Sequence, residues 1–489
     1  MIDMLEHRTS LVDELLAEQS KLDTAVARFS DWHCDKDNDD GHAQARHYRE
    51  LIPLSKPKPG EQYAFEVNLD QCTGCKACVA ACHSLNGLDD DESWRDVGML
   101  VGDVYIPYQQ TVTTACHHCL DPACSNGCPV LAYEKDAVTG IVRHLDDQCI
   151  GCSYCILKCP YDVPKYNKKR GIVRKCDMCQ QRLDVGEAPA CVQSCPNGAI
   201  AIRVVDVAGV SASTKTLGTR LLPTAMVSEY TQPSTRYISK REIPSSATGS
   251  TNASPAIEDT HLPLVVMLVL TQFSTGAILF AQNTAMLWIG AITAIIVINA
   301  SVLHLGQPLK AWRCFLGWRK SWLSREILAF GGFAPAAIGA ALHLIPSPVA
   351  AAVGLASVFC SVMVYVDTRR AYWTMSQTLP KFFGTTLTLG LALAACWDRQ
   401  FLLPTIIAAV IKMLWEAGFR ARQEVQAEQT HRLLFGSLNP IWSARVIVGV
   451  LGATLMTVSP VPGFALLLIA ELLERALFFK AGAAWRMPR

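Results

Sequence analysis

The sequence CTGCKACVAAC at residues 72–82 decides the fold of the first half of this chain, and CIGCSYCILKC at residues 149–159 repeats its cysteine spacing. The spacing CxxCxxCxxxC binds [4Fe-4S] clusters in ferredoxins that hold two of them. Three thiolates on one tight loop bind one cubane, whereas the fourth cysteine, on the helix that follows, binds the other cluster. We therefore expect groups of four cysteines that exchange their fourth members.

Two further cysteine groups have longer gaps but keep the pattern of three plus one. The longest gap separates Cys179 from Cys191 in the last group. Four such groups predict four [4Fe-4S] clusters in a double ferredoxin-like domain, which is an α+β fold. The expected metal ligands are Cys72, Cys75, Cys78, Cys82, Cys116, Cys119, Cys124, Cys128, Cys149, Cys152, Cys155, Cys159, Cys176, Cys179, Cys191 and Cys195.

A short internal repeat indicates that one unit was duplicated. Residues 70–75 read DQCTGC and residues 147–152 read DQCIGC. Proline follows the fourth cysteine in three of the groups, where its fixed φ ends the turn that carries the cysteine. His83 takes that position in the first group. This departure relaxes the turn but removes no ligand.

Other thiol chemistry fits the spacing less well. Zinc ribbons use two well-separated CxxC pairs, whereas the first group places four thiols within eleven residues. Disulfides need an oxidising compartment, and the first sixty residues contain no secretory h-region or cleavage site. A membrane scaffold with structural metal sites is the alternative from another class of protein. Four cysteines outside the pattern read as small apolar side chains: Cys34, Cys314, Cys360 and Cys396.

The second half of the chain is strongly apolar. Hydrophobic residues make up 50% of the whole chain, and their excess lies after residue 260. Runs with almost no charge and a length suited to a bilayer predict an all-α polytopic membrane domain of about eight transmembrane helices. The runs cover residues 262–281, 285–304, 326–344, 347–366, 382–397, 400–417, 443–460 and 463–480. The fifth and sixth are short, so their ends are the least defined.

Basic residues are concentrated in the loops on the side from which the chain enters the membrane. The opposite loops contain only Arg399. By the positive-inside rule the basic side is cytoplasmic, so we expect a multi-pass protein of the inner membrane with its iron-sulfur domain in the cytoplasm. The basic residues are Lys310, Arg313, Arg319, Lys320, Arg325, Arg369, Arg370, Lys381, Arg420, Arg422, Arg432 and Arg445.

Composition divides the chain into five segments. They are an acidic N-terminal helix and linker (1–60), the cluster domain (61–205), a mostly flexible linker rich in Ser, Thr and Pro (206–261), the membrane anchor (262–480) and a cytoplasmic tail (481–489). A basic run at residues 165–175 comes without a recognisable nucleic-acid-binding fold or aromatic platform. We expect a solvated loop, or a face for an acidic partner, and no nucleic acid.

Several of these motifs resemble those of a known family. CHHCLDPAC at residues 116–124, with CIGC at 149–152 and KCPY at 158–161, is similar to the four-cluster electron-transfer subunit of the dimethyl sulfoxide reductase family over residues 62–202. LHLGQPL at 303–309 and WLSREI at 322–327 resemble the quinone-interacting anchor subunit of the same complexes. These subunits are usually separate polypeptides, and here they look fused.

The resemblance implies a molybdopterin subunit as the catalytic partner and the quinone pool as the source or sink of electrons. The chain itself would be a non-catalytic electron conduit. The implied reaction is reduction of dimethyl sulfoxide or a related oxide, but oxidation of sulfite with quinone as acceptor stays open because of the cytoplasmic orientation. The implied ligand sets are Cys72, Cys75, Cys78 with Cys195; Cys176, Cys179, Cys191 with Cys82; Cys116, Cys119, Cys124 with Cys159; and Cys149, Cys152, Cys155 with Cys128.

His304 is the candidate residue for the quinone site. It ends the second apolar run on the side of the cluster domain, where an imidazole can exchange a proton with a headgroup; a local hydrogen bond is the alternative. Haem b would need facing histidines, and His343 lies at the opposite membrane face.

Glu471, Glu474 and Arg475 lie in the last apolar run, where ionisable groups are costly and often functional. Glu471 and Arg475 are also four residues apart, which fits a structural pair on one helix face.

Overall fold

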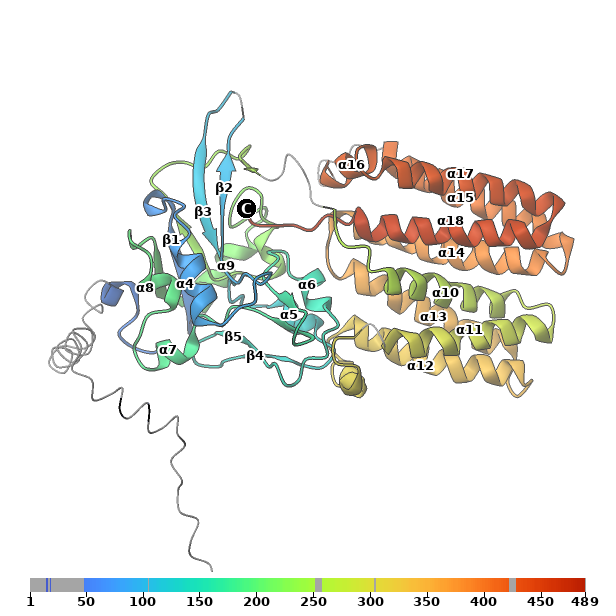
Figure 1. The fold of residues 1–489 in the computed structure, drawn as a ribbon, viewed down its shortest axis with the longest axis horizontal. Coiled ribbons are helices and arrows are strands. Elements are labelled where there is room, and N and C mark those ends of the chain that lie inside the picture. Colours follow the sequence, from blue (N-terminus) through green and yellow to red (C-terminus); the bar gives the residue numbers. More distant parts are fainter. Residues whose placement is uncertain are drawn as a thin grey trace, which may run out of the picture.

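The computed structural model describes residues 48–103, 105–250, 257–302, 305–421 and 428–488, together with Leu15 and Glu18. Apart from those two residues, the expected helix at residues 1–30 lies outside this range. The described residues form two parts, which we call the cluster domain (residues 48–250) and the anchor domain (residues 257–488). The long helices of the anchor domain run side by side away from one end of the cluster domain (Figure 1).

Two three-stranded sheets and two hairpins form the framework of the cluster domain. In the first sheet β1 pairs antiparallel with β8, from Glu61 opposite Asp206 to Val67 opposite Ile200, and β9 joins β1 in parallel. The second sheet has the order β10-β2-β3, and β4-β5 and β6-β7 are the hairpins. The strands are β1 Glu61–Asn68, β2 Asp96–Val101, β3 Gln109–Thr114, β4 Tyr133–Lys135, β5 Val142–His144, β6 Lys165–Asn167, β7 Ile172–Arg174, β8 Ile200–Asp206, β9 Arg236–Ile238 and β10 Thr248–Gly249.

Short helices follow the cysteine loops and hold the later cysteines of each group. Cys78 and Cys82, for example, lie on the buried face of α4. Apolar strand residues such as Phe65, Leu100 and Ile202 pack with these cysteines in one core. The helices are η1 Arg49–Leu51, η2 Leu69–Gln71, α4 Ala77–Leu85, α5 Ala123–Gly127, α6 Tyr154–Lys158, α7 Gln180–Asp184 and α8 Ala190–Gln193.

Residues 206–250 are a folded part of the cluster domain, in contrast to the mostly flexible linker that we expected at residues 206–261. They include α9 (Val207–Lys215), η3 (Ser228–Tyr230), β9 and β10. Leu222 and Ala225 are buried in the core of the domain. The hydroxyls of Ser and Thr here satisfy buried polar groups; Ser234 Oγ, for instance, donates to the carbonyl of His117 at 2.8 Å. Serine and threonine, which are typical of linkers, therefore form a polar surface that packs inside the domain.

The anchor domain has eight long helices in its described part, and each overlaps one of the expected apolar runs. Five of them, α10, α11, α13, α15 and α17, lie in segments long and apolar enough to cross a membrane. The fifth run was expected to be short, but α14 has 21 residues because it begins at Met375. The long helices are α10 Leu262–Leu279, α11 Thr284–Val302, α12 Trp322–Ala341, α13 Ser347–Val366, α14 Met375–Ala395, α15 Leu402–Ala421, α17 Asn439–Val458 and α18 Pro460–Lys480.

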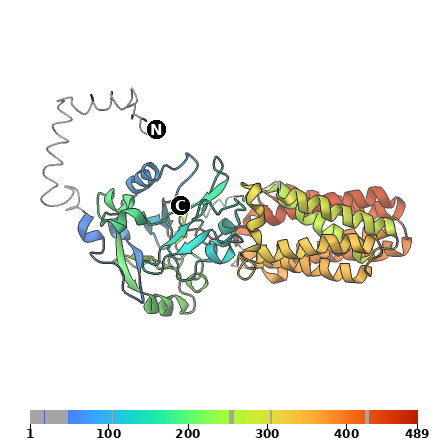
Figure 2. The ribbon, with the colours of Figure 1, turned by 90° about the horizontal axis from the view of Figure 1, so that it is seen from below.

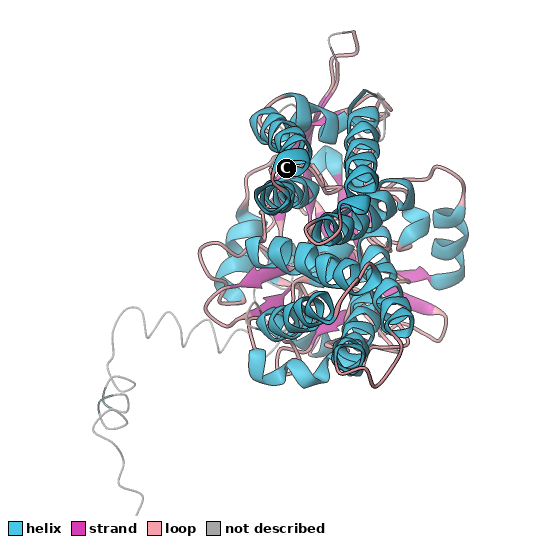
Figure 3. Ribbon diagram, turned by 90° about the vertical axis from the view of Figure 1, so that its right-hand side faces the viewer, coloured by secondary structure: helices cyan, strands magenta, loops and turns pink. Residues whose placement is uncertain are grey.

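Successive long helices run in alternating directions, and the bundle keeps one axis in both side views (Figures 1 and 2). Seen end on, the helices of the anchor domain lie beside one another in one bundle (Figure 3). Small residues allow close crossings: a Cβ on Gly276 of α10 would lie 2.3 Å from the carbonyl oxygen of Thr386 and 2.9 Å from Cα of Gly390 in α14. Such contacts stabilise helix pairs where no hydrophobic effect acts between them.

Shorter segments at the cluster-domain end of the bundle complete the anchor domain. They are η5 Pro308–Phe315, η6 Ala371–Trp373 and α16 Glu428–Phe435, with η7 Arg399–Phe401 at the opposite end. After α18 the chain returns to the cluster domain. Arg486 pairs with Glu258 at 2.6 Å, and Met487 is buried in the cluster-domain core. The expected tail is thus packed and not free.

Candidate redox site

The four CxxC loops of the cluster domain share one backbone feature. The residue before the second cysteine has a left-handed conformation in each loop: Gly74 (φ 74°), His118 (φ 40°), Gly151 (φ 70°) and Met178 (φ 62°). This conformation is favoured by glycine and costs about 1–2 kcal/mol elsewhere. Because His118 and Met178 adopt it as well, the loop shape is set by what the loop must hold and not by glycine alone.

Two cavities in the cluster domain are each lined by four cysteines. Their members come from different motifs, as expected for exchanged fourth ligands. One cavity is lined by Cys116, Cys119, Cys124 and Cys159. The other is lined by Cys82, Cys176, Cys179 and Cys191.

The remaining two groups also gather cysteines from distant parts of the sequence. Burial raises the pKa of the Cys155 thiol well above its usual value, and the nearby thiols of Cys152, Cys128 and Cys149 raise it further. Burial likewise raises the pKa of Cys78, and Cys195 is among the thiols that add to the effect. Cys128 and Cys195 therefore lie beside the groups to which the resemblance assigned them.

The donor set suits iron-sulfur clusters. Backbone N–H groups donate to several cysteine sulfurs, and such donors stabilise a charged thiolate. The contacts repeat between motifs: Ala132 N to Cys128 Sγ and Ala199 N to Cys195 Sγ at 3.2 Å, and Gly151 N to Cys149 Sγ and Met178 N to Cys176 Sγ at 3.4 Å.

Single-ion binding fits this arrangement less well. In the described residues, no three His, Cys, Asp or Glu side chains converge as ligands of one metal ion. Zinc would require four ligands that converge on one ion. In a [4Fe-4S] cluster each of the four thiolates binds a different iron, so the sulfurs need not converge on one point. The cysteine quartets therefore fit the cubane.

Two buried cations lie between the cysteine groups. Arg95 is 2% exposed, lines the cavity of Cys82 and donates to Thr113 Oγ1 at 3.2 Å. Lys175 is 3% exposed and donates to Cys116 Sγ at 3.7 Å and to the carbonyl of Cys176 at 2.8 Å. Their positive charge offsets the thiolates, which would otherwise repel one another in a poorly hydrated interior.

The group of Cys149, Cys152 and Cys155 lies at the junction with the anchor domain. On α6, Tyr154 Oη donates to the carbonyl of Val364 at 2.8 Å, and Lys158 Nζ pairs with Asp367 Oδ2 at 2.6 Å. Next to the cysteine loop, Gln307 N donates to the carbonyl of Ile150 at 3.0 Å. These contacts fix the group of Cys149, Cys152 and Cys155 against the membrane-side helices.

Three glycines allow the closest approach at this junction. A Cβ on Gly151 would lie 2.2 Å from the carbonyl oxygen of Gly171 and 2.9 Å from Cα of Gly306. Gly171 is at the tip of the β6-β7 hairpin, inside the basic run of residues 165–175. Several basic side chains of this run pair with acidic residues of the same domain, for example Lys169 with Asp89 at 2.5 Å and Arg174 with Glu92 at 3.1 Å. The hairpin is therefore an internal docking element.

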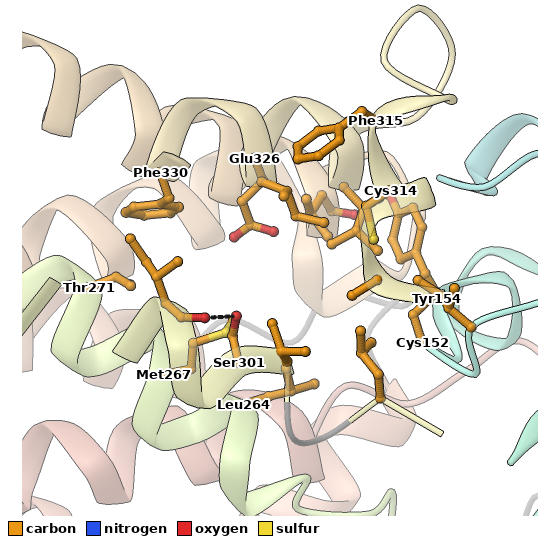
Figure 4. A pocket seen from close by; sticks show the side chains of 18 of the residues that line it. Cys152, Tyr154, Leu264, Met267, Thr271, Ser301, Cys314, Phe315, Glu326 and Phe330 are labelled. Carbon is orange, nitrogen blue, oxygen red and sulfur yellow. Dashed lines mark hydrogen bonds between the residues drawn. The ribbon is translucent and has the colours of Figure 1, made fainter. Parts of the chain in front are cut away.

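A cavity of about 300 Å³ opens where the cluster domain meets the anchor domain. Cys152 and Tyr154 line its cluster-domain end, and side chains of α10, α11, α12, α13 and η5 line the rest (Figure 4). The lining is mostly apolar. It consists of Ile150, Cys152, Tyr154, Leu157, Leu264, Met267, Thr271, Ile298, Ser301, Val302, Leu305, Ala311, Trp312, Cys314, Phe315, Leu323, Glu326, Ile327, Phe330, Val364 and Tyr365.

Among the described residues of this lining, Glu326 has the one acidic side chain. It is 6% exposed, its carboxylate points into the cavity (Figure 4), and Ser361 Oγ donates a hydrogen bond to it. In the sequence this residue stood out only as part of the WLSREI motif, and we expected no role for it. The available signal was a carboxylate at the start of an apolar run, which is costly in a membrane and therefore worth a functional hypothesis.

The other residues that the sequence singled out lie in different parts of the anchor domain or outside the described residues. His304 lies outside the described residues, but Val302 and Leu305 on either side of it line the cavity. His343 lies at the opposite end of the bundle, 3.0 Å from Thr284 Oγ1. Glu471, Glu474 and Arg475 are fully buried on α18, and none of them lines the cavity among the residues that the structure describes.

Comparison with known proteins gives matches for both parts of the molecule. A 4Fe-4S dicluster domain matches residues 108–205, and the DMSO reductase anchor subunit (DmsC) matches residues 259–434. The B subunit of anaerobic dimethyl sulfoxide reductase from Haemophilus influenzae is 35% identical over 156 residues, which are 30% of this sequence and 76% of the relative.

Two proteins of Escherichia coli K12 are also similar to this sequence. The B subunit of anaerobic dimethyl sulfoxide reductase is 38% identical over 157 residues, 30% of this sequence and 75% of the relative. The iron-sulfur subunit of nitrate-inducible formate dehydrogenase is 34% identical over 173 residues, 30% of this sequence and 57% of the relative.

Proposed function

Because this protein belongs to the family of dimethyl sulfoxide reductase iron-sulfur subunits, with the anchor domain of such reductases fused behind it, we propose that it carries electrons between the quinone pool and a molybdopterin partner. It is an iron-sulfur electron-transfer subunit with a multi-pass membrane anchor. The four cysteine quartets hold four [4Fe-4S] clusters, which supply one-electron steps. All eight long helices span the membrane.

One observation carries the quinone assignment. Cys152 belongs to the quartet of Cys149, Cys152 and Cys155 and also lines the cavity between the two domains. Mostly apolar cavities of this size with a few polar groups are typical of small-molecule sites. A quinone headgroup in this cavity would be separated from the quartet by little more than the wall that Cys152 forms, which favours direct electron exchange.

Glu326 and His304 accept and donate the protons of this exchange. Oxidation of a quinol releases two electrons and two protons, and the electrons leave through the Cys152 side of the cavity. The Glu326 carboxylate accepts a proton from a quinol hydroxyl, and Ser361 holds it toward the cavity through its hydrogen bond. When the quinone is reduced, the same carboxyl group donates a proton to it. His304 is the second proton carrier, as its place between Val302 and Leu305 favours.

The charge distribution supports a cytoplasmic cluster domain. Lys310 and Arg313 on η5 donate to the carbonyl of Asp147 in the cluster domain at 3.0 and 2.9 Å. The basic loops of the anchor therefore lie on the same side as the clusters, and basic loops stay in the cytoplasm. The catalytic partner is then cytoplasmic as well. Reduction of dimethyl sulfoxide or a related oxide is the reaction that the relatives favour, and sulfite oxidation is the second candidate.

Metal content and cluster reduction test the proposal. Four clusters require about sixteen irons and as many acid-labile sulfides per polypeptide, whereas a structural metal scaffold would contain zinc and no sulfide. A quinol analogue should reduce the clusters in the purified protein, as followed by electron paramagnetic resonance. Zinc in place of iron, or clusters that dithionite reduces and quinol does not, would refute the proposal.

A variant at Glu326 tests the cavity. Glu326→Gln should slow quinol-driven cluster reduction by about 10²-fold or more, since a positioned general base contributes about 10²–10⁴-fold. Glu428→Gln is the matched control, because Glu428 is an exposed carboxylate that pairs with Arg432 on α16. A rate for Glu326→Gln equal to that of the control would remove Glu326 from the site.

A further inference from the structure

Seven ionisable side chains are buried together among the C-terminal helices of the anchor domain. They come from α14, α15, α17 and α18, and each side chain is at most 9% exposed. None of them lines the cavity described above, as far as the described residues show. We call them the ion network: Lys381, Lys412, Glu416, Arg445, Glu471, Glu474 and Arg475.

Glu474 is surrounded by three cations. Its carboxylate lies 3.4 Å from Lys381 Nζ, 3.7 Å from Lys412 Nζ and 3.6 Å from Arg475. Neither carboxylate oxygen has a hydrogen-bond partner among the described residues. Glu471, by contrast, accepts from Lys412, from Thr385 at 2.6 Å and from Arg445 at 3.1 Å. The network is thus well bonded at Glu471 and poorly bonded at Glu474.

The ion network lies inside the apolar part of the bundle. Lys381 is six residues from the start of α14 and Glu471 nine residues from the end of α18, which places them about 9–14 Å from the cluster-domain ends of those helices at 1.5 Å per residue. Apolar side chains of similar volume could hold these helices together without a loss of stability. Ionisable groups at such depth mark a functional site by default.

The charges of the network do not balance. Four cations face three carboxylates, which leaves one positive charge in a medium where an uncompensated charge is costly. Arginine does not release its proton in proteins, so only a lysine can remove this charge. Lys412 lies within 4 Å of Glu416, Glu471 and Glu474, whereas Lys381 has one carboxylate within this distance, that of Glu474. Of the two lysines, Lys381 therefore has fewer carboxylate partners.

Other groups around Lys381 permit both of its protonation states. Tyr372 Oη lies 2.5 Å from Lys381 Nζ, where it accepts from an ammonium and can donate to an amine. The ring of Phe478 lies 5.7 Å away on α18. Toward the cluster-domain side, Tyr372 packs on Phe419 and Phe419 on His431, whose buried ring nitrogens have no partner in the described structure. This sequence of contacts leads from Lys381 to the bundle end.

The network also adjoins the cavity. Thr271 lines the cavity, and the next residue, Gln272, accepts a hydrogen bond from Arg475 at 2.9 Å. From the other side, Arg475 lies 3.9 Å from the ring centre of Phe382, which contacts Tyr365 in the cavity wall. Charge that arrives in the cavity or at the adjoining cysteine quartet therefore acts on the network through a poorly screening interior.

We infer that the ion network is a proton-exchange site and that Lys381 carries its exchangeable proton. The inference rests on the proposed function, because the electron that drives the exchange arrives at the quartet of Cys152. An added electron favours the ammonium form of Lys381, and its departure favours the amine. The step forms or breaks one N–H bond, the proton comes from or returns to water on the cluster-domain side, and no electron is moved by Lys381 itself.

Proton uptake on reduction tests this directly. The purified protein, in detergent with a pH-indicator dye, would be reduced electrochemically under anaerobic conditions at several pH values. Lys381→Arg keeps the positive charge and the pairing with Glu474 but cannot release a proton. We expect it to lose a part of the proton uptake per electron that the unmodified protein and the control Lys480→Arg retain. Its cluster spectra should not change.

A second variant guards against misfolding of the first. Lys381→Met removes the uncompensated charge, so it should fold and should also lose this proton uptake. Uptake in both variants equal to that of the unmodified protein would overturn the inference. Quinol-driven reduction is measured separately: if quinol fails to reduce the clusters while uptake still depends on Lys381, the quinone proposal fails and the proton site stands.

Discussion

Replacing Gly306 with alanine tests whether the contact between the two domains sets the rate of electron exchange at the cavity. A Cβ on Gly306 would lie 2.0 Å from the carbonyl oxygen of Gly171 and 2.7 Å from Tyr166 Oη, whereas ordinary contacts begin at 3.4 Å. The shorter of these two distances is 1.4 Å below an ordinary contact. Small shifts of the anchor loop and of the β6-β7 hairpin must therefore together separate the two segments by more than 1 Å. Overpacking of this kind costs about 1–3 kcal/mol.

The displaced loop is the one that holds the cysteine quartet against the cavity. A misplacement of about 1 Å between reacting groups can reduce a rate by about 10²-fold, so we expect quinol-driven cluster reduction in Gly306→Ala to slow by one to two orders of magnitude. Stopped-flow absorbance of the clusters measures this rate. Reduction by dithionite, which does not need the cavity, should be unchanged.

Gly332→Ala is the matched control for this experiment. Gly332 lies on α12 of the same domain, and a Cβ there would meet no atom within 4 Å. Alanine in a helix is favoured over glycine by about 0.5–1 kcal/mol, so this variant should keep the full rate. If Gly306→Ala also kept it, the glycine contact would not position the redox groups and the reasoning from the junction would be refuted.

Three further predictions concern the cluster domain. Cys159→Ser should remove the cluster of the cavity lined by Cys116 and lower the iron content by about four atoms per polypeptide; an unchanged iron content would contradict the exchanged-ligand assignment. Arg95→Met should lower the midpoint potential of the adjoining clusters, as measured by redox titration with electron paramagnetic resonance, because the cation favours the more negative reduced state; a shift of about 59 mV corresponds to a tenfold change in equilibrium constant. Asp136→Ala should lower the melting temperature of the domain by a few degrees, since Asp136 Oδ1 accepts from Thr139 N at 2.7 Å and from Val138 N at 3.0 Å and such a loss costs about 1 kcal/mol. A hydrogen bond from the backbone of Thr139 holds the pKa of Asp136 below its usual 3.8. The stabilisation by the carboxylate is therefore complete above pH 3.8 and is lost only as the pH falls through the lowered pKa. The loss of melting temperature in Asp136→Ala should be equal at pH 6 and pH 9.

Local spacing in the sequence was sufficient for the features that depend on near neighbours. The CxxC loops and the apolar runs are such features, because a few adjacent residues determine loop shape and helix hydropathy. The ends of α14 were harder to predict. Its first turns contain Lys381 and several threonines that are buried against other helices, so a polar sequence there does not mark a membrane surface.

The cavity could not be derived from the sequence, because its lining comes from six segments that only tertiary packing brings together. Glu326 had a visible signal, but its role depends on Ser361 and on the distance in space to Cys152. The prediction of a mostly flexible linker at residues 206–261 was wrong for residues 206–250, for a related reason. Serine and threonine are typical of solvated linkers, and here their hydroxyls bond to buried backbone groups of a distant segment.

The junction between the two domains is held by direct contacts of α6, of the loop at Gln307 and of η5, and both partners belong to one polypeptide. Tethering makes their association intramolecular, at an effective concentration in the millimolar range for a short connection. Dilution of the protein in the lipid therefore cannot separate the cysteine groups from the cavity of the anchor domain, and every anchor domain carries its own set of cysteine groups.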